Sequence, residues 1–203
     1  MPFISASYFV GEINVDQASA NTSLTQAITQ YEKEILIQLL GYKLYSLLIA
    51  DCTDFVPATQ KYLDLVNGKE FTQEYNGQDV TIKWEGLANA QFQSLISYYV
   101  FYKYVERDVT RLYGTGVSMA ESKEGWQRAS AVNKLCAAWE RMRELYGKVP
   151  PVYKNHYDKP VKGSDLSHVF NCDASAYNFL LANKVDYPDW IFTPQWNINA
   201  FGI

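Results

Sequence analysis

The stretch from Gln91 to Tyr113, QFQSLISYYVFYKYVERDVTRLY, constrains the fold more than any other part of the chain. Its apolar residues recur at helical spacing and fall on one face: Phe92, Leu95, Tyr99, Tyr102, Val105, Val109 and Leu112. The middle, residues 98–102, is apolar nearly all round, so other elements must cover it on more than one side. A strand is the alternative, but no Gly or Pro interrupts the run and strands usually end after about 5–6 residues. The stretch therefore predicts a central helix.

The tyrosines of this stretch allow a second interpretation, because aromatic side chains are enriched at protein interfaces. Their helical spacing favours the helix core instead, where each tyrosine hydroxyl needs a hydrogen-bond partner. We therefore expect other helices to be laid around the central one.

Two helices are expected early in the chain. The first begins near Asn21 or Thr22, which are suitable N-cap residues, and ends at Leu40. Gly41 is placed to end it in the left-handed conformation that glycine tolerates. A shorter helix follows over residues 42–50.

The remaining helices surround and include the central one. Pro57 is expected in the first turn of a helix that ends at Asn67-Gly68. The central helix spans 87–112, and the glycines of 114–116 separate it from a helix over 119–146. A short glycine connection between two long helices predicts an antiparallel helix pair.

The pattern changes to alternation in EFTQEYNGQDVTIKW, around Asn76-Gly77. Asn-Gly supplies the positive φ angles of a type I′ turn, which is the strongest short signal for a β-hairpin. We place the strands at 70–75 and 79–84. A lone hairpin is marginal in water, so this one docks on the helices, extends a sheet or projects into a partner. We expect it to be peripheral and to serve contacts rather than folding.

Both ends of the chain are expected to be largely extended. Phe3 to Val10 is too short to stand alone and should lie along other elements. Residues 148–203 are read as a polar loop, a last helix over 174–183 capped by Asp173, and an arm from Tyr187 onward whose prolines exclude a helix. The arm is too aromatic for a disordered tail, so it should lie in a groove of its own subunit or of a neighbour. We favour the neighbour.

These elements predict a mainly α fold in a single domain over residues 1–203. It is a helical bundle with a long antiparallel helix pair, one β-hairpin insertion at 70–84 and a loop with an extended C-terminal arm at 148–203. Candidates for partner contacts lie at the hairpin turn, at the hairpin exit and along the arm: Asn76, Gly77, Trp84, Tyr187, Trp190, Phe192, Trp196 and Phe201.

The net charge limits the classes of partner that the protein can bind, and the cysteine content indicates its redox compartment. Lys and Arg number 18 against 22 Asp and Glu, a net charge of −4, which argues against an electrostatic grip on nucleic acid but not against a wall past which DNA slides. The scattered cysteines indicate a reducing compartment without a disulfide framework. The N-terminus lacks the pattern of a signal peptide and no stretch approaches a membrane span, so we expect a soluble protein without membrane contact.

No group of residues has the spacing of a catalytic or metal site. His168, Cys172 and Asp173 are close in sequence, but a structural zinc usually takes four ligands with paired spacing, and a Cys–His nucleophile pair would rest on one cysteine in a polar loop. Lysines and tyrosines alternate over 153–162, where a solvated loop is favoured over a phosphate or nucleic-acid contact. We expect no catalytic residue, no metal and no cofactor.

Several motifs give the chain a family resemblance. They are LLGYKLY after the first helix, KWEGL at the hairpin exit and SYYVFYKY in the central helix, within roughly residues 20–147. In these motifs and in the order of its parts, the chain resembles the head-to-tail connector (adaptor) proteins of tailed bacteriophages. It is most similar to those of phages of gut Bacteroidetes, including the ring proteins of crAss-like phages.

The resemblance implies a structural virion protein without enzymatic activity. Such a subunit forms a ring, commonly of about twelve copies, that lies below the portal and links the capsid to the tail. It implies the portal and adjacent neck or tail rings as partners, and genomic DNA that passes through without sequence-specific binding. The location would be the virion neck, after assembly in the bacterial host cytoplasm.

Two alternatives stay open beside this expectation. One is a helical adaptor domain that binds a single protein partner through its tyrosine face. The other is a small helical enzyme that uses His156, His168 or Cys172.

Overall fold

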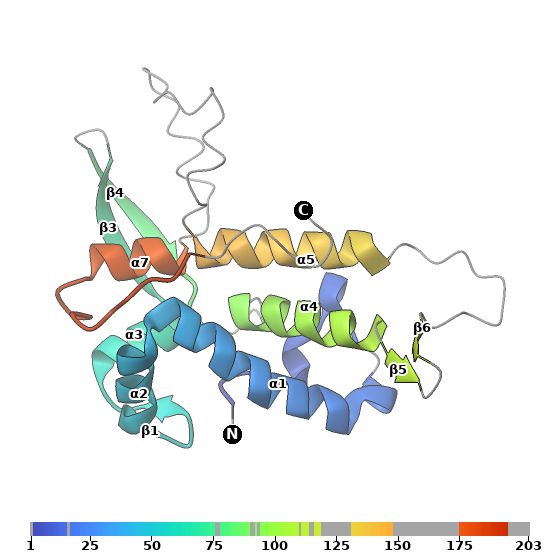
Figure 1. Cartoon of the computed structure of the whole chain (residues 1–203). Helices are drawn as coiled ribbons and strands as arrows, with labels where there is room; N and C mark the ends of the chain where they lie inside the picture. Colours follow the sequence, from blue (N-terminus) through green and yellow to red (C-terminus); the bar gives the residue numbers. More distant parts are fainter. Residues whose placement is uncertain are drawn as a thin grey trace.

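The computed structural model of the chain has a mainly helical fold, as the sequence predicts (Figure 1). The structure describes residues 2–15, 17–75, 78–89, 92, 94–109, 111–113, 116–118, 131–147 and 175–194. The helices are α1 (Gln17–Leu40), α2 (Tyr42–Asp51), α3 (Gln60–Asn67), α4 (Leu95–Val109), α5 (Ala131–Tyr146) and α7 (Ala176–Ala182). Short antiparallel pairs join β1 (Cys52–Thr53) to β2 (Val56–Pro57), β3 (Lys69–Tyr75) to β4 (Gln78–Trp84), and β5 (Arg111–Tyr113) to β6 (Gly116–Ser118).

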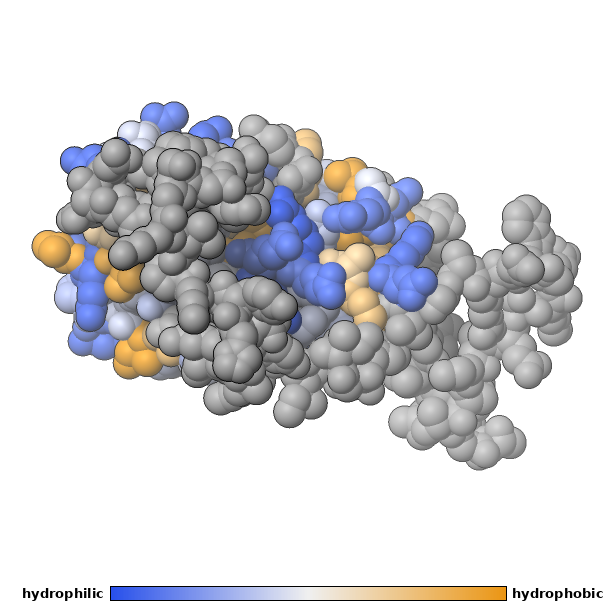
Figure 2. All heavy atoms as spheres, turned by 90° about the horizontal axis from the view of Figure 1, so that it is seen from above, coloured by the Kyte–Doolittle hydropathy of each residue, from blue (hydrophilic) through white to orange (hydrophobic). Residues whose placement is uncertain are grey.

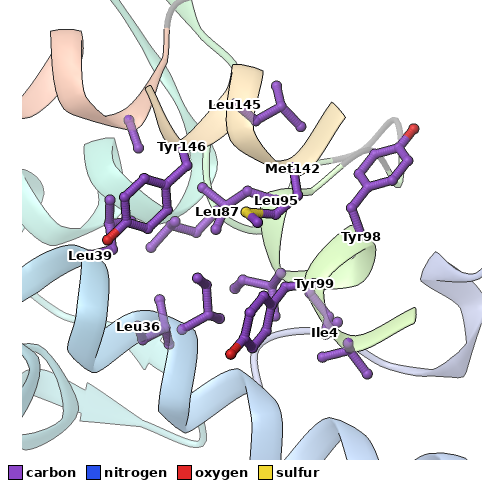
Figure 3. Packing of buried hydrophobic residues seen from close by; sticks show 14 of the residues in the cluster. Ile4, Leu36, Leu39, Leu87, Leu95, Tyr98, Tyr99, Met142, Leu145 and Tyr146 are labelled. Atoms are coloured by element: carbon purple, nitrogen blue, oxygen red, sulfur yellow. The ribbon is translucent and has the colours of Figure 1, made fainter. Parts of the chain in front are cut away.

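Helix α4 lies at the centre of the fold, between α1 and α5, and runs antiparallel to α5 (Figure 1). Every residue from Leu95 to Tyr102 is buried. Figure 3 shows how Leu36 of α1, Tyr99 of α4 and Met142 of α5 point into one shared core. The prediction of a central helix covered on several sides is confirmed.

The buried tyrosines of α4 find partners for their hydroxyls. The Tyr98 hydroxyl donates to Glu12 Oε1 at 2.7 Å, and the Tyr99 hydroxyl donates to Glu34 Oε1 at 2.5 Å. Burial, and then the neighbouring carboxylate, raises the pKa of Tyr98 to about 12 and raises that of Tyr99 as well. The rings of Tyr99 and Tyr102 pack against Trp139 of α5, with centroids 6.4 and 4.7 Å apart. The tyrosines of α4 therefore hold the bundle together.

The ends of α4 differ from the prediction. The helix begins at Leu95 rather than at Leu87, because Ser94 caps it: Ile96 N donates to Ser94 Oγ at 3.1 Å. At the other end, the expected glycine break carries the β5–β6 pair. The predicted helix over 119–146 is described only from Ala131 onward, and residues 119–130 lie outside the described part of the chain.

Three further helix starts were predicted incorrectly. Helix α1 begins at Gln17, before the predicted caps Asn21 and Thr22. Pro57 lies in β2 and not in the first turn of α3, whose N-cap is Thr59. The carboxylate of Asp51 accepts from the amides of Ala58 and Thr59, at 3.0 and 2.8 Å, and so holds the chain before α3. Helix α7 is capped by Ser175, which accepts from Asn178 N, whereas the predicted cap Asp173 lies outside the described residues.

The N-terminal segment is folded into turns and is not extended as predicted. It forms the 3-10 turns η1 (Ala6–Tyr8) and η2 (Gly11–Ile13), which pack on α1 and α5. Short backbone hydrogen bonds close these turns, such as Tyr8 N to Ser5 O at 3.1 Å. Among the described residues, no helix has the length and apolar character needed to cross a membrane.

Replacing Tyr99 with alanine should lower the free energy of unfolding by ~3–5 kcal/mol, because a large buried ring is removed from the core. Tyr42, which is 71% exposed, supplies the matched control, and Tyr42→Ala should change stability by less than ~0.5 kcal/mol. Denaturant unfolding followed by circular dichroism measures both. Similar effects of the two substitutions would contradict the central position of Tyr99.

Candidate partner-contact site

The first predicted contact residue, Trp84, belongs to the core. Its side chain is 2% exposed, and its indole Nε1 donates to the Leu65 carbonyl at 2.9 Å. The Trp84 ring stacks on the ring of Phe179 of α7, with centroids 5.9 Å apart. The ring of Phe71 of β3 meets the Phe179 ring edge-on, with centroids 5.6 Å apart. The prediction of Trp84 as a partner contact is therefore wrong, because this side chain fixes the base of the hairpin to the body.

Two glycines let the hairpin base cross the end of α3 at very close range. Gly68 and Gly86 have φ angles of 97° and 94°, which other residues rarely adopt. A Cβ on Gly86 would lie 2.5 Å from the Val66 carbonyl, so no larger residue fits there. The close approach lets the amides of Leu87 and Ala88 donate to the carbonyls of Leu65 and Val66, at 3.2 and 2.8 Å. The motif KWEGL is thus a cap for the end of α3.

A similar cap closes the end of α1 and is supplied by residues 187–194, which we call the strap. The indole Nε1 of Trp190 donates to the Leu39 carbonyl at 2.9 Å. The amide of Ile191 donates to Leu40 O and that of Thr193 to Gln38 O, both at 3.3 Å. Gly41, with a φ of 77°, leaves room for the strap, since a Cβ there would lie 3.1 Å from Ile191 Cβ.

Aromatic contacts hold the rest of the strap on its own subunit. Tyr187 is 1% exposed and its hydroxyl donates to the Lys61 carbonyl; burial raises its pKa. The ring of Phe192 packs on Tyr146 and Tyr177, with centroids 5.4 and 4.7 Å away. Our preference for a groove on a neighbour is therefore wrong for residues 187–194, and Tyr187 is a core residue.

The other predicted contact residues fall into two groups. Trp190 and Phe192 are only half-buried, but both hold the strap in place on its own subunit. Asn76, Gly77, Trp196 and Phe201 lie outside the described residues, so their predicted role stays a prediction.

Among the described residues, the surface available for contacts includes the outer hairpin and several exposed apolar side chains. Beyond the Phe71–Ile82 pair, the hairpin stands away from the helices (Figure 1), and Thr72 and Thr81 are exposed. Figure 2 looks at the α5 side, where hydrophilic side chains gather over the middle of the face. Tyr42 and Ile191 flank Gly41 and are 71% and 66% exposed.

Metal-ligating and thiol groups are the candidates for chemistry among the described residues. Within them, no group of three or more His, Cys, Asp or Glu side chains is placed to hold a metal ion. Cys52 and Cys136 are free, and burial raises the pKa of Cys52, which keeps it a thiol. His156, His168 and Cys172 lie outside the described part of the chain.

Two truncations should separate the strap from the residues after it. Ending the chain after Pro194 keeps every strap contact described above and should leave the melting temperature close to that of the full chain. Ending it after Asp186 removes Tyr187 and the cap of α1, which should cost at least ~3 kcal/mol. Thermal melting measures both truncations. A chain ending at Asp186 that melts like the full chain would contradict a structural role of the strap.

Comparison with known proteins gives one match. The model of a family of unknown function (DUF6712) matches residues 36–131, somewhat less than half of the 203-residue chain. No curated protein and no solved structure matches. The matched region runs from the end of α1 through the hairpin and α4 to the start of α5. It contains Gly41 at the end of α1, and Gly68 and Gly86 at the end of α3.

Proposed function

We propose that this protein is a structural virion protein, a subunit of a ring in the neck of a tailed bacteriophage. The ring would link the portal and capsid to the tail and form part of the channel through which genomic DNA passes. Its partners would be further copies of the chain, the portal protein and the adjacent neck or tail ring.

The observation that carries this proposal is the rigidly mounted hairpin. Its base is fixed by Trp84 and Phe71 against Phe179, so its direction relative to the bundle is set. Its outer part is a two-stranded ribbon with exposed residues, and such a ribbon is marginal in water unless something packs on it. A stiff arm that needs a second surface fits a protein that assembles with others.

The positions of the family motifs also support the proposal. LLGYKLY spans the joint of α1, α2 and the strap, and KWEGL spans the joint of α3 and the hairpin. Two of the three motifs that carry the resemblance therefore lie where the angles between the parts of the subunit are set, and the third, SYYVFYKY, lies within α4. Fixed angles are what a closed ring of identical subunits requires.

The charge of the chain is compatible with a channel that DNA traverses. A net charge of −4 gives no general attraction to phosphates, and binding of DNA rises steeply with the number of Lys and Arg contacts. A weakly acidic wall therefore lets the duplex slide without holding it.

The ring is tested by electron microscopy and native mass spectrometry of the purified protein, alone and with the portal protein of the same phage. We expect a closed species of about twelve copies, formed by the protein itself or on the portal. A stable complex of one copy with one partner would instead support the adaptor alternative. Failure to bind the portal in any stoichiometry would overturn the proposal.

The hairpin should be needed for assembly but not for folding of the subunit. Replacing residues 74–79 with Asn-Gly shortens the ribbon and keeps Gln73 opposite Val80, so the base retains its register. We expect unchanged melting and a loss of ring formation. The contrasting variant Trp84→Ala should lose ~3–5 kcal/mol of stability. A shortened variant that assembles like the wild type would show that the outer ribbon makes no essential contact.

A further inference from the structure

The N-terminal segment, residues 2–15, is held to the bundle by a set of deep contacts. Ile4, Tyr8, Phe9 and Ile13 are buried, and Figure 3 shows Ile4 beside Tyr99 in the core. The Tyr8 hydroxyl donates to the Asn89 carbonyl at 3.1 Å. The segment therefore covers the seam where the chain enters α4.

Two of its aromatic contacts are made by residues with positive φ angles. Phe3 meets Phe55 edge-on with centroids 5.5 Å apart, and Tyr8 meets Phe92 in the same way at 5.1 Å. Phe55 and Phe92 have φ angles of 63° and 57°, the left-handed region that bulky residues rarely adopt. Besides these two, the only other non-glycine residue with positive φ in the described chain is Asp54, next to Phe55. Asp54 and Phe55 are the central pair of the turn between β1 and β2, where Thr53 pairs with Val56, and a two-residue hairpin turn of this kind takes positive φ at both positions. Phe92 is therefore the strained residue at the contact with the segment.

The third contact buries a carboxyl group. Glu32 of α1 is 5% exposed, and its two oxygens accept from the amides of Phe3 and Ile4, at 2.8 and 3.1 Å. Among the described residues, no Lys or Arg forms an ion pair with it. An ionised carboxylate in such a place loses most of its hydration.

We propose that the N-terminal segment is a latch that opens without unfolding of the bundle, and that rising pH favours the open state. Opening lets Phe92 relax and returns the Glu32 carboxyl to water. Strained positions of this kind persist only while the surrounding structure holds them, and they are typical of switch regions. This inference goes beyond the proposed ring and holds for the isolated subunit.

The direction of the pH effect follows from proton linkage. Burial raises the pKa of Glu32 from 4.5 to about 7, and the hydrogen bonds from Phe3 and Ile4 and the charge of the chain N-terminus lower it in part. The closed latch therefore holds a proton that the open latch releases between these two pH values. Going from pH 5 to pH 8 should favour opening by at least ~10-fold.

The other titratable groups facing Glu32 leave this direction unchanged. Besides the charge of the chain N-terminus, they are the phenols of Tyr8, from η1, and Tyr45, from α2. Burial, followed by the charge of Glu32, raises the pKa of each phenol above its ordinary value of 10, so both remain neutral in this pH range.

The test is amide hydrogen exchange by NMR on the full chain at pH 5 and pH 8, corrected for intrinsic exchange. The reporters are the amides of Phe9 and Ile13, which are hydrogen-bonded within the segment, and amides in the middle of α4 serve as the reference. We expect the reporters to be less protected than α4 at both pH values and to lose at least ~10-fold of protection at pH 8. Protection equal to that of α4 would show that the segment leaves only on global unfolding and would overturn the proposal.

The variant Glu32→Gln tests the source of the pH effect, because it cannot ionise and still offers one acceptor to the segment. Its reporter protection should be independent of pH. Should this variant not fold, carboxyl ¹³C titration of the wild type decides: a Glu32 midpoint near 7 supports the latch, and a midpoint near 4.5 overturns it.

Discussion

An α-helix leaves its last carbonyls without partners inside the helix, and the organisation of this protein depends on how two such ends are satisfied. At the end of α1 the donors are one tryptophan indole and two backbone amides of the strap; at the end of α3 they are one tryptophan indole and two amides of the hairpin exit. In both places a glycine with positive φ follows the helix and gives the incoming chain room. Donors from distant segments thus take the place of water, and each cap is also a joint between two parts of the fold.

The two joints meet through Phe179 of α7. Its ring touches Trp84 and Phe71 at the hairpin base and Tyr187 at the start of the strap. The short helix α7 therefore ties the hairpin, α3 and the strap into one unit, which packs on α1 and α5. This arrangement explains how a ribbon that is marginal by itself can hold a fixed direction, which is the property on which the proposed role in assembly rests.

The sequence predicted the elements well and their partners poorly. Periodicity placed α1, α4 and the hairpin because it reports which face of an element is buried. Periodicity could not tell whether Trp84 and Tyr187 lie in the core or at an interface, because an aromatic ring is favourable in both environments. Helix starts were missed where a side chain from elsewhere or a serine decides them, as Asp51 does before α3 and Ser94 does before α4. Gly86, in the KWEGL motif, was a signal for a close approach of two backbone segments. The sequence did not show that the amides of Leu87 and Ala88 would donate to the end of α3, because that contact depends on the tertiary fold.

The cap on α1 also has a consequence for the order of folding. Leu39 and Trp190 are 151 residues apart in the chain, so the end of the first long helix is completed by residues that are synthesised much later. At about 5–20 residues per second, translation separates the two by on the order of ten seconds. The end of α1 therefore receives these donors only after Trp190 and its neighbours have been synthesised, and a nascent chain that lacks the strap does not present the finished surface of the subunit.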